Sequence, residues 1–464
     1  MLLSIWTQAK SSNFISAINN LVLPVFVSGI ISTACFAAEN STQLTLPDDW
    51  EVQVHCASTG EGSAFTAAVS VPPPAVLAVA AERHNGLPIY NPQASAYARG
   101  ARLEALKSDK FTASDLLVAE SVIVRSGPAE SDSRFLRGQD YELESRWGRI
   151  GRLPNGRIKE GDVVYVSYRH ALPRIDSIFL GANGAIEYRT GQPRAETPVP
   201  PECADGQRRL ANIWIPGPIE RLTTDHLFPI METAYPESAA MVPRIAEQRI
   251  PHAIAKLRSG ETLRILAWGD SVTDGAYLKD PERDRWQSQF VHRLKKRFPT
   301  ANIELITEAW GGRTTGSYLA APLGQPHNFQ QTVLDVRPDL IISEFVNDAH
   351  LNEARVEERY GKLLSEFQKI NAEWIILTPH YVRPDWMDLD RQRDIDDDPR
   401  PYVKGLRSFA AKHQLALADA SLRYGRLWRQ GIPYNTLMVN CINHPNASGL
   451  AIFADALMEL MPRN

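Results

Sequence analysis

The stretch that decides the fold runs from residue 265 to residue 275 and reads Ile265-Leu266-Ala267-Trp268-Gly269-Asp270-Ser271-Val272-Thr273-Asp274-Gly275. It begins as an apolar strand and passes directly into a tight turn. We therefore expect Ser271 at the end of the strand, with its hydroxyl and its backbone N–H facing one cleft. An ordinary strand–helix turn, in which Ser271 or Asp270 only caps a helix, fits the segment equally well.

The same alternation continues to the end of the chain. Apolar runs occur at residues 263–268, 303–307, 340–345, 374–377 and 415–418, and helical stretches at 283–297, 353–369, 402–412 and 448–461. This pattern predicts βαβ units around a parallel sheet. Such sheets place their ligand sites at the carboxyl ends of the strands, so functional residues should lie at those junctions.

The N-terminal half has a different sequence pattern. Alternating or β-branched runs at 50–56, 64–71, 116–125, 162–168 and 175–180 are separated by proline and glycine. Asn183-Gly184 lies between two apolar runs and predicts a type I′ hairpin turn. We expect a β-rich, sandwich-like accessory domain over residues 45–217, a helical connector over 218–262 and a second domain over 263–464.

The first 37 residues have the pattern of an export signal. No charge occurs between Lys10 and Glu39, and residues 21–36 are mostly apolar. Small residues before Ala38 fit a signal-peptidase site. An uncleaved membrane anchor and a lipid-attached Cys35 are the alternatives. The expected location is secreted or periplasmic, with membrane contact only if the segment is retained or lipidated.

Composition excludes several classes of protein. The chain has 464 residues, of which 44% are apolar and 22% charged, as in ordinary globular proteins. The 50 basic residues nearly balance the 54 acidic ones, and the net charge is −4. A nucleic-acid partner is therefore not expected.

Cysteine and histidine spacing does not indicate a metal site. No CxxC or HExxH pattern occurs, so neither a metal nor another cofactor is expected. Removal of the signal would leave Cys56, Cys203 and Cys441, and Cys56 could pair with Cys203. The acidic segment 385–400 is interpreted as a solvated loop.

Candidate partners for Ser271 follow the later strands. Gly312 lies in a Gly-Gly loop after the second strand, Asn347 follows the third, and His444 precedes the last helix. The glycine N–H and the asparagine amide could stabilise an oxyanion, and His444 could act as a base. His380 follows the fourth strand on the same side, where it would line an acyl or alcohol pocket or be a plain loop residue.

These four blocks together resemble the SGNH hydrolase family, also called GDSL-type esterases and lipases. The matching residues are Ser271 in Gly-Asp-Ser-Val-Thr, Gly312 in Gly-Gly-Arg-Thr-Thr, Asn347 in Phe-Val-Asn-Asp and His444 in Ile-Asn-His-Pro. The resemblance covers about residues 263–462. It implies a flavodoxin-like α/β/α domain, Ser271 as nucleophile, His444 as base, and an oxyanion hole of Ser271, Gly312 and Asn347, without a metal.

One position departs from the family pattern. The aspartate that usually stands three residues before the histidine is replaced by Cys441, and the neighbouring Asn440 is uncharged. A thiol cannot supply the fixed negative charge that orients and stabilises the imidazolium. Either another group orients His444, or the site works as a Ser–His dyad.

The expected function is a secreted serine esterase that removes short acyl groups, with acetyl as the expected group, from a carbohydrate. A lipase, phospholipase or thioesterase would use the same residues. A surface-binding protein with a relic hydrolase domain is the alternative from another class. Retention of the four signature residues disfavours this non-catalytic alternative.

Overall fold

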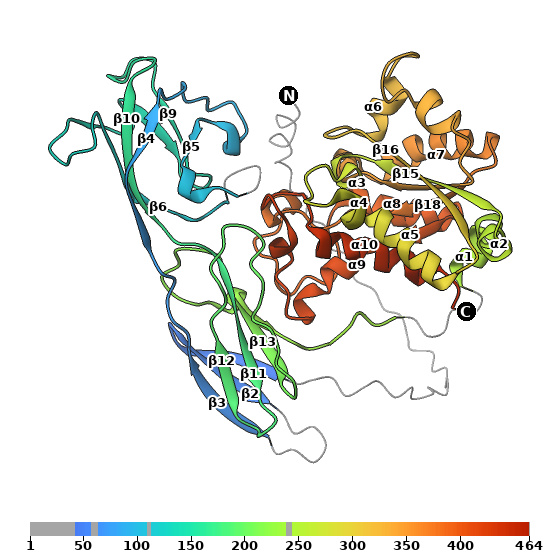
Figure 1. Ribbon diagram of the computed structural model, residues 1–464, viewed down its shortest axis with the longest axis horizontal. Helices are drawn as coiled ribbons and strands as arrows, with labels where there is room; N and C mark the ends of the chain where they lie inside the picture. The colour runs from blue at the N-terminus through green and yellow to red at the C-terminus, as the bar shows by residue number, and fades with distance from the viewer. Residues whose placement is uncertain (1–41, 57–63, 109–112, 238–243, 464) are drawn as a thin grey trace, which may run out of the picture.

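The computed structural model describes residues 42–56, 64–108, 113–237 and 244–463. The predicted export signal lies outside these residues. Within them, the chain folds into β-rich units on one side and an α/β domain on the other (Figure 1). No helix of the described residues is both long enough and apolar enough to cross a membrane.

The α/β domain is built on five parallel strands in the order β16-β15-β17-β18-β19. Their bounds are Asn302–Ala309 for β16, Thr262–Gly269 for β15, Leu340–Glu344 for β17, Glu373–Leu377 for β18 and Ala416–Ala418 for β19. Numbered along the chain, this order is 2-1-3-4-5, the flavodoxin-like arrangement. The fold class predicted for this half is confirmed.

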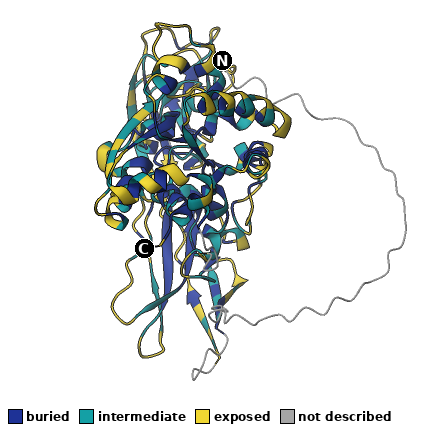
Figure 2. Cartoon of the chain, turned by 90° about the vertical axis from the view of Figure 1, so that its right-hand side faces the viewer, coloured by how far each residue is buried: buried dark blue, intermediate teal, exposed yellow. Residues whose placement is uncertain are grey.

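Helices cover both faces of the sheet because alternate residues of each strand point to opposite layers. Ile265 and Ala267 face one core, with α2, α5 and α10, whereas Leu266 and Trp268 face a second core, with α6, α7 and α8. Buried residues follow the strands between these two layers (Figure 2). The helices are α1 Ile245–Arg249, α2 Pro251–Ser259, α3 Ser271–Asp274, α4 Pro281–Asp284, α5 Trp286–Arg297, α6 Thr315–Ala320, α7 Glu353–Lys369, α8 Pro401–Lys412, α9 Ala420–Gly425 and α10 Ala447–Leu460.

The N-terminal region is β-rich, as predicted; its strands are antiparallel, and it contains two cores. In the first β unit, the sheet β1-β2-β3 packs on the sheet β12-β11-β13-β14 around one apolar core. Its strands are β1 Thr42–Asp48, β2 Glu51–Cys56, β3 Phe65–Ser70, β11 Arg174–Leu180, β12 Ile186–Arg189, β13 Arg208–Ile215 and β14 Leu227–Pro229. This unit is a sandwich, and β14 falls within the stretch predicted as a helical connector.

The second β unit is inserted between the strands of the first. Its two sheets, β4-β10-β6-β7 and β5-β9-β8, enclose a separate core. The strands are β4 Leu77–Asn85, β5 Ala101–Arg102, β6 Leu117–Arg125, β7 Arg134–Phe135, β8 Tyr141–Glu144, β9 Arg149–Arg152 and β10 Val163–His170. The sequence predicted one sandwich-like domain, whereas the chain forms a sandwich interrupted by this second unit.

Three local expectations are corrected by the structure. Gly184 has φ of 78°, but Asn183 is not at positive φ and instead accepts a hydrogen bond from Ala185 N, so the hairpin turn is not of type I′. Cys56 is buried and Cys203 is exposed, and both are free thiols. The segment 385–400 is not wholly solvated.

Asp398 is a buried acidic residue within that segment. Its side chain is fully buried and forms an ion pair with Arg400. It also accepts a hydrogen bond from Ser421 Oγ at 2.7 Å. The segment is therefore anchored in the α/β domain, since a buried charge must be paired.

Candidate active site

Ser271 stands where β15 ends and α3 begins. Asp270 caps this helix by accepting a hydrogen bond from Val272 N at 3.1 Å. The turn is so tight that a Cβ on Gly269 would lie 2.1 Å from Thr273 Oγ1. Glycine is therefore required before Asp270, and the chain delivers Ser271 to the carboxyl edge of the sheet.

His444 is brought to Ser271 from the loop before α10. The distance between His444 Nε2 and Ser271 Oγ is 3.0 Å, although the residues are 173 positions apart. The imidazole stacks on the ring of Tyr277, with 4.4 Å between centroids and 10° between planes. Distance and orientation are those of a nucleophile and its base.

Asn440 contacts the side of the imidazole that faces away from Ser271. Its Oδ1 accepts hydrogen bonds from the backbone N–H groups of Ile442, Asn443 and His444, each at 3.0 Å. These donors fix the amide, so that its Nδ2 lies 3.1 Å from His444 Nδ1. Asn440 therefore both shapes the loop and contacts the ring.

Cys441 occupies the position of the family's aspartate but turns away from the imidazole. It has φ of 55°, and its side chain packs against the core of the second β unit. Burial raises the pKa of this thiol to about 12, so it stays neutral at ordinary pH. The sequence placed Asn440 nearby but offered no means of choosing it, because the contact depends on a turn that reverses Cys441.

Asn347 lies beside Ser271, after β17. Its Nδ2 donates to Asp270 Oδ2 at 2.8 Å, and its backbone N donates to the same oxygen at 2.9 Å. A primary amide has two N–H groups, so one remains for a substrate oxygen. Asp270 thus holds the amide predicted for the oxyanion hole.

The glycine loop after β16 lies against the nucleophile. Trp310 N donates to Gly269 O at 3.1 Å, which joins this loop to the end of β15. A Cβ on Gly311 would lie 3.7 Å from Ser271 Cβ, whereas Gly312 is exposed, with φ of 71° and open space around it. Gly312, the predicted oxyanion residue, follows Gly311 in the same loop, and Gly311 is the neighbour of Ser271 that the sequence argument did not single out.

Two further carboxyl groups lie buried beneath these loops. Asp348 accepts hydrogen bonds from Thr315 Oγ1 at 2.6 Å and Thr315 N at 3.2 Å, which joins the start of α6 to the Asn347 turn. Burial, together with the charge of Asp270, raises the pKa of Glu344 well above its usual range. Burial also raises the pKa of Asp270, to about 7. Asp270 accepts three N–H donors, whereas Glu344 accepts the Thr273 hydroxyl at 3.4 Å and the Val346 backbone N–H, so Glu344 is the carboxyl group that keeps its proton.

His380 lies behind the site rather than on its surface. Its side chain is fully buried, with Tyr424 and Phe453 as ring neighbours. Burial lowers the pKa of His380 well below its usual value, and the Arg400 charge adds to the effect. A neutral, enclosed imidazole packs under the His444 loop and does not line an open pocket.

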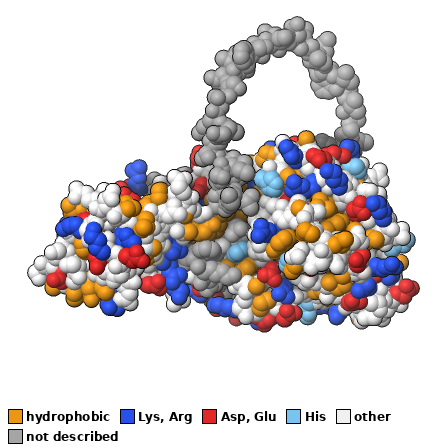
Figure 3. All heavy atoms as spheres, turned by 90° about the horizontal axis from the view of Figure 1, so that it is seen from above, with side chains coloured by type: hydrophobic (Ala, Val, Ile, Leu, Met, Phe, Trp, Pro, Cys, Tyr) orange, Lys and Arg blue, Asp and Glu red, His pale blue; other side chains and the backbone are white. Residues whose placement is uncertain are grey.

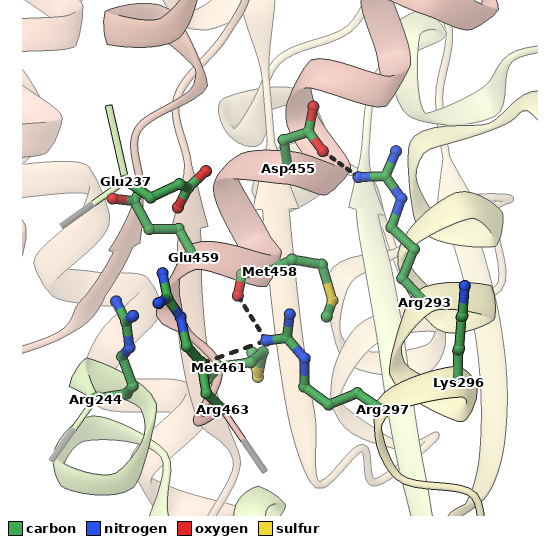
Figure 4. Close-up of a pocket in the computed structure, with 10 residues that line it drawn as sticks. All are labelled: Glu237, Arg244, Arg293, Lys296, Arg297, Asp455, Met458, Glu459, Met461 and Arg463. Carbon is green, nitrogen blue, oxygen red and sulfur yellow. Dashed lines mark hydrogen bonds and ion pairs between the residues drawn. The ribbon is translucent and has the colours of Figure 1, made fainter. Parts of the chain in front are cut away.

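A cavity of about 650 Å³ lies at the other end of the α/β domain (Figure 4). It is formed by the C-terminal ends of α5 and α10 and includes Arg297 and Met458. Ser271 and His444 lie instead at the beginnings of α3 and α10. This cavity is therefore separate from the candidate active site.

A family model matches the part of the chain that contains the candidate site. The model of the GDSL-like Lipase/Acylhydrolase family matches residues 267–452, a range that includes Ser271, Gly312, Asn347 and His444. A comparison with curated proteins finds no match.

Several solved structures are similar to the chain. A two-domain esterase active on acetylated mannans is 21% identical, with a TM-score of 0.37, over 46% of this chain and 52% of that chain. The similarity thus spans about half the length of that esterase. An acetylxylan esterase from Geobacillus stearothermophilus is 19% identical, with a TM-score of 0.34, over 43% of this chain and 94% of that chain. The C-terminal part of the chain therefore contains a GDSL-like lipase/acylhydrolase domain, over residues 267–452.

Proposed function

We propose that this protein is a serine ester hydrolase that works through an acyl-enzyme. The observation that carries the proposal is the 3.0 Å contact between Ser271 Oγ and His444 Nε2, with the Asn347 amide held beside them. This set contains a nucleophile, a base and an oxyanion donor at one strand edge. An ordinary helix-capping role for Ser271 would not require the other two.

The reaction proceeds in two halves. His444 Nε2 takes the proton of Ser271 Oγ as this oxygen attacks the ester carbonyl carbon, and the oxyanion is stabilised by Ser271 N–H, Gly312 N–H and Asn347 Nδ2. His444 then gives the proton to the alcohol oxygen, the C–O bond breaks and the acyl group stays on Ser271. Water attacks the acyl-enzyme, with His444 accepting its proton, and the carboxylic acid leaves as Ser271 regains its hydrogen.

We propose a short acyl ester of a carbohydrate as the substrate. Basic and acidic side chains are interspersed on the visible face (Figure 3), and the net charge is only −4. Such a surface suits a neutral polar ligand better than a polyanion or an anionic membrane.

A series of esters tests the activity and its acyl preference. Rates on p-nitrophenyl acetate, butyrate and octanoate should fall as the acyl chain lengthens, and the Ser271→Ala variant should be inactive on all three. Release of acetate from acetylated xylan or mannan should exceed hydrolysis of triglyceride or phospholipid. A preference for octanoate and for lipids would contradict the proposed carbohydrate esterase and indicate a lipase. No hydrolysis of any ester by the wild type would overturn the function.

We also propose that the protein is exported. The uncharged stretch between Lys10 and Glu39 and the small residues before Ala38 support this. Expression of the full chain in a bacterial host, followed by fractionation and N-terminal sequencing, should give a protein outside the cytoplasm that begins at Ala38. Recovery of the full-length chain in the cytoplasm would contradict the proposal.

A further inference from the structure

The second β unit contacts the backbone of the loop that carries His444. Ser108 Oγ donates to Val439 O at 2.9 Å, and both residues are buried. Val439 N in turn donates to His444 O at 2.8 Å. One hydroxyl of the β unit is therefore connected to the backbone of His444 through a single residue.

Cys441 provides a second contact from within the same loop. Its side chain packs against the apolar core of the second β unit, and the Ser114 backbone amide hydrogen-bonds to the thiol. The left-handed backbone at Cys441 directs the thiol to this unit, while Asn440, one residue earlier, contacts the imidazole. The adjacent side chains of Asn440 and Cys441 thus contact the His444 ring and the second β unit, respectively.

The other side of the loop is supported by Arg383. Its backbone N donates to Ile442 O at 2.9 Å, and its guanidinium lies 4.8 Å from the ring centroid of Trp147. Arg383 also pairs with Asp385, which forms an ion pair with Arg146 at 3.1 Å. Trp147 and Arg146 belong to the second β unit, so this support depends on the β unit too.

A contact elsewhere between the two halves of the molecule is different in kind. Arg391 of the α/β domain pairs with Asp225 at 2.8 Å, and both side chains are about half exposed. Exposed ion pairs contribute little free energy. The Ser108–Val439 contact to the His444 loop, by contrast, is buried and involves the loop backbone.

We propose that the second β unit is a positioning element of the active site, and that Ser108 and Cys441 act through the loop to hold His444 at Ser271. This inference rests on the proposed hydrolase function. The base must stay within hydrogen-bond reach of the nucleophile, and a displacement of about 1 Å in such a site can cost about a hundredfold in rate. Residues 438–445 contain no helix and only one β-bridge, between Met438 and Pro445, so contacts from the second β unit add to the hydrogen bonds that the loop makes within itself.

Variants of the full-length protein test this role. Ser108→Ala removes the hydroxyl that holds Val439, and Cys441→Ala removes the atom that enters the β core. We expect kcat on p-nitrophenyl acetate to fall by about tenfold with KM nearly unchanged, because the base is displaced and the substrate surface is not. Cys441→Ser retains an acceptor for Ser114 N–H and should recover most of the rate.

Asp225→Asn is the matched control, since it breaks a contact between the halves far from the loop. It should leave kcat unchanged. All variants are compared well below their melting temperatures, with the folded state checked by circular dichroism. If the Ser108→Ala and Cys441→Ala proteins were folded and had the wild-type kcat, the proposal would be overturned. A decrease in kcat of the same size in Asp225→Asn would also overturn it.

The rate at which a fluorophosphonate labels Ser271 separates this inference from the proposed function. Labelling needs the activated serine but no particular ester. If the wild type is labelled but hydrolyses none of the esters, the proposed substrate class fails, and slower labelling of Ser108→Ala and Cys441→Ala would still support positioning. A wild type that is neither labelled nor active would overturn both.

Discussion

Asn347 and Asp270 are joined by two hydrogen bonds that end on one oxygen atom. The backbone N and the side-chain Nδ2 of Asn347 donate to Asp270 Oδ2 at 2.9 and 2.8 Å. The second oxygen of Asp270 accepts from Val272 N at 3.1 Å, at the start of the helix that carries Ser271. The carboxylate therefore fixes the oxyanion donor relative to the nucleophile.

Replacement of Asp270 by asparagine should disturb this arrangement. The new amide has only one acceptor oxygen, and its nitrogen would face an N–H donor, so Asn347 and Val272 could not both be satisfied. We expect kcat to fall by about tenfold or more, with a small change in KM. Steady-state kinetics on a short-chain ester provide the measurement. A loss confined to KM would contradict this role of Asp270.

Removal of the Asn347 amide should have a larger effect. Asn347→Ala should lower kcat by about a hundredfold or more, because the amide acts on charge that develops only in the transition state. KM should change little. Comparison of kcat with that of Asp270→Asn separates the effect of losing the donor, Asn347, from the effect of losing Asp270, which holds it. If kcat of Asn347→Ala stayed near the wild-type value, the oxyanion hole would have to be formed without this residue.

Asn440→Asp should convert the contact with His444 into a charged one. The backbone donors would hold one carboxylate oxygen, and the other would take the place of Nδ2, which lies 3.1 Å from His444 Nδ1. A carboxylate there stabilises the imidazolium, so the acid limb of the pH profile of kcat/KM should move to higher pH. The measurement is kcat/KM between pH 5 and pH 9.

The adjacent Cys441→Asp variant is the control for this prediction. Cys441 packs against the core of the second β unit, so a carboxylate there would be buried away from His444. We expect a lower Tm and no shift of the acid limb towards higher pH. If Cys441→Asp shifted the limb and Asn440→Asp did not, the two positions would have exchanged the roles assigned to them.

Glu344→Gln should change how stability depends on pH. Burial raises the pKa of Glu344 well above its ordinary value of 4.5, so the folded protein keeps a proton that the unfolded chain releases. The free energy of unfolding of the wild type therefore decreases as pH rises above about 4.5 and up to the folded-state pKa. Glutamine does not titrate, so the variant does not lose stability in this way. The difference between the Tm of the variant and the Tm of the wild type should therefore increase as the pH is raised from 5 to 9. The exposed Glu160→Gln variant should show no such trend, and a flat difference for Glu344→Gln would contradict a buried neutral carboxyl group.

The α/β half was predictable because its signals are local. Each parallel strand is an apolar run, and each signature residue follows a strand or precedes the last helix, so Ser271, Asn347 and His444 could be placed from short patterns. The carboxyl edge of the sheet then brings them together.

The remaining features depend on contacts between distant segments. The first β unit packs strands before residue 71 against strands after residue 173, and no local pattern tells which distant strands share a core. Asn440 takes over the contact with His444 only because the backbone is left-handed at Cys441. Asp398 lies among other acidic residues, so the sequence does not distinguish it from its exposed neighbours. Its burial is explained by the ion pair with Arg400, which is seen in the structure.

The wide separation of Ser271 and His444 has a consequence for synthesis of the chain. The two residues are 173 positions apart, which at about 5–20 residues per second corresponds to about 9–35 s of translation. Ser108 and Val439 are separated by 331 positions, so the support for the base also waits for the last part of the chain. A nascent chain that already displays its serine cannot yet hydrolyse esters, and reactivity arises only as the final helix docks.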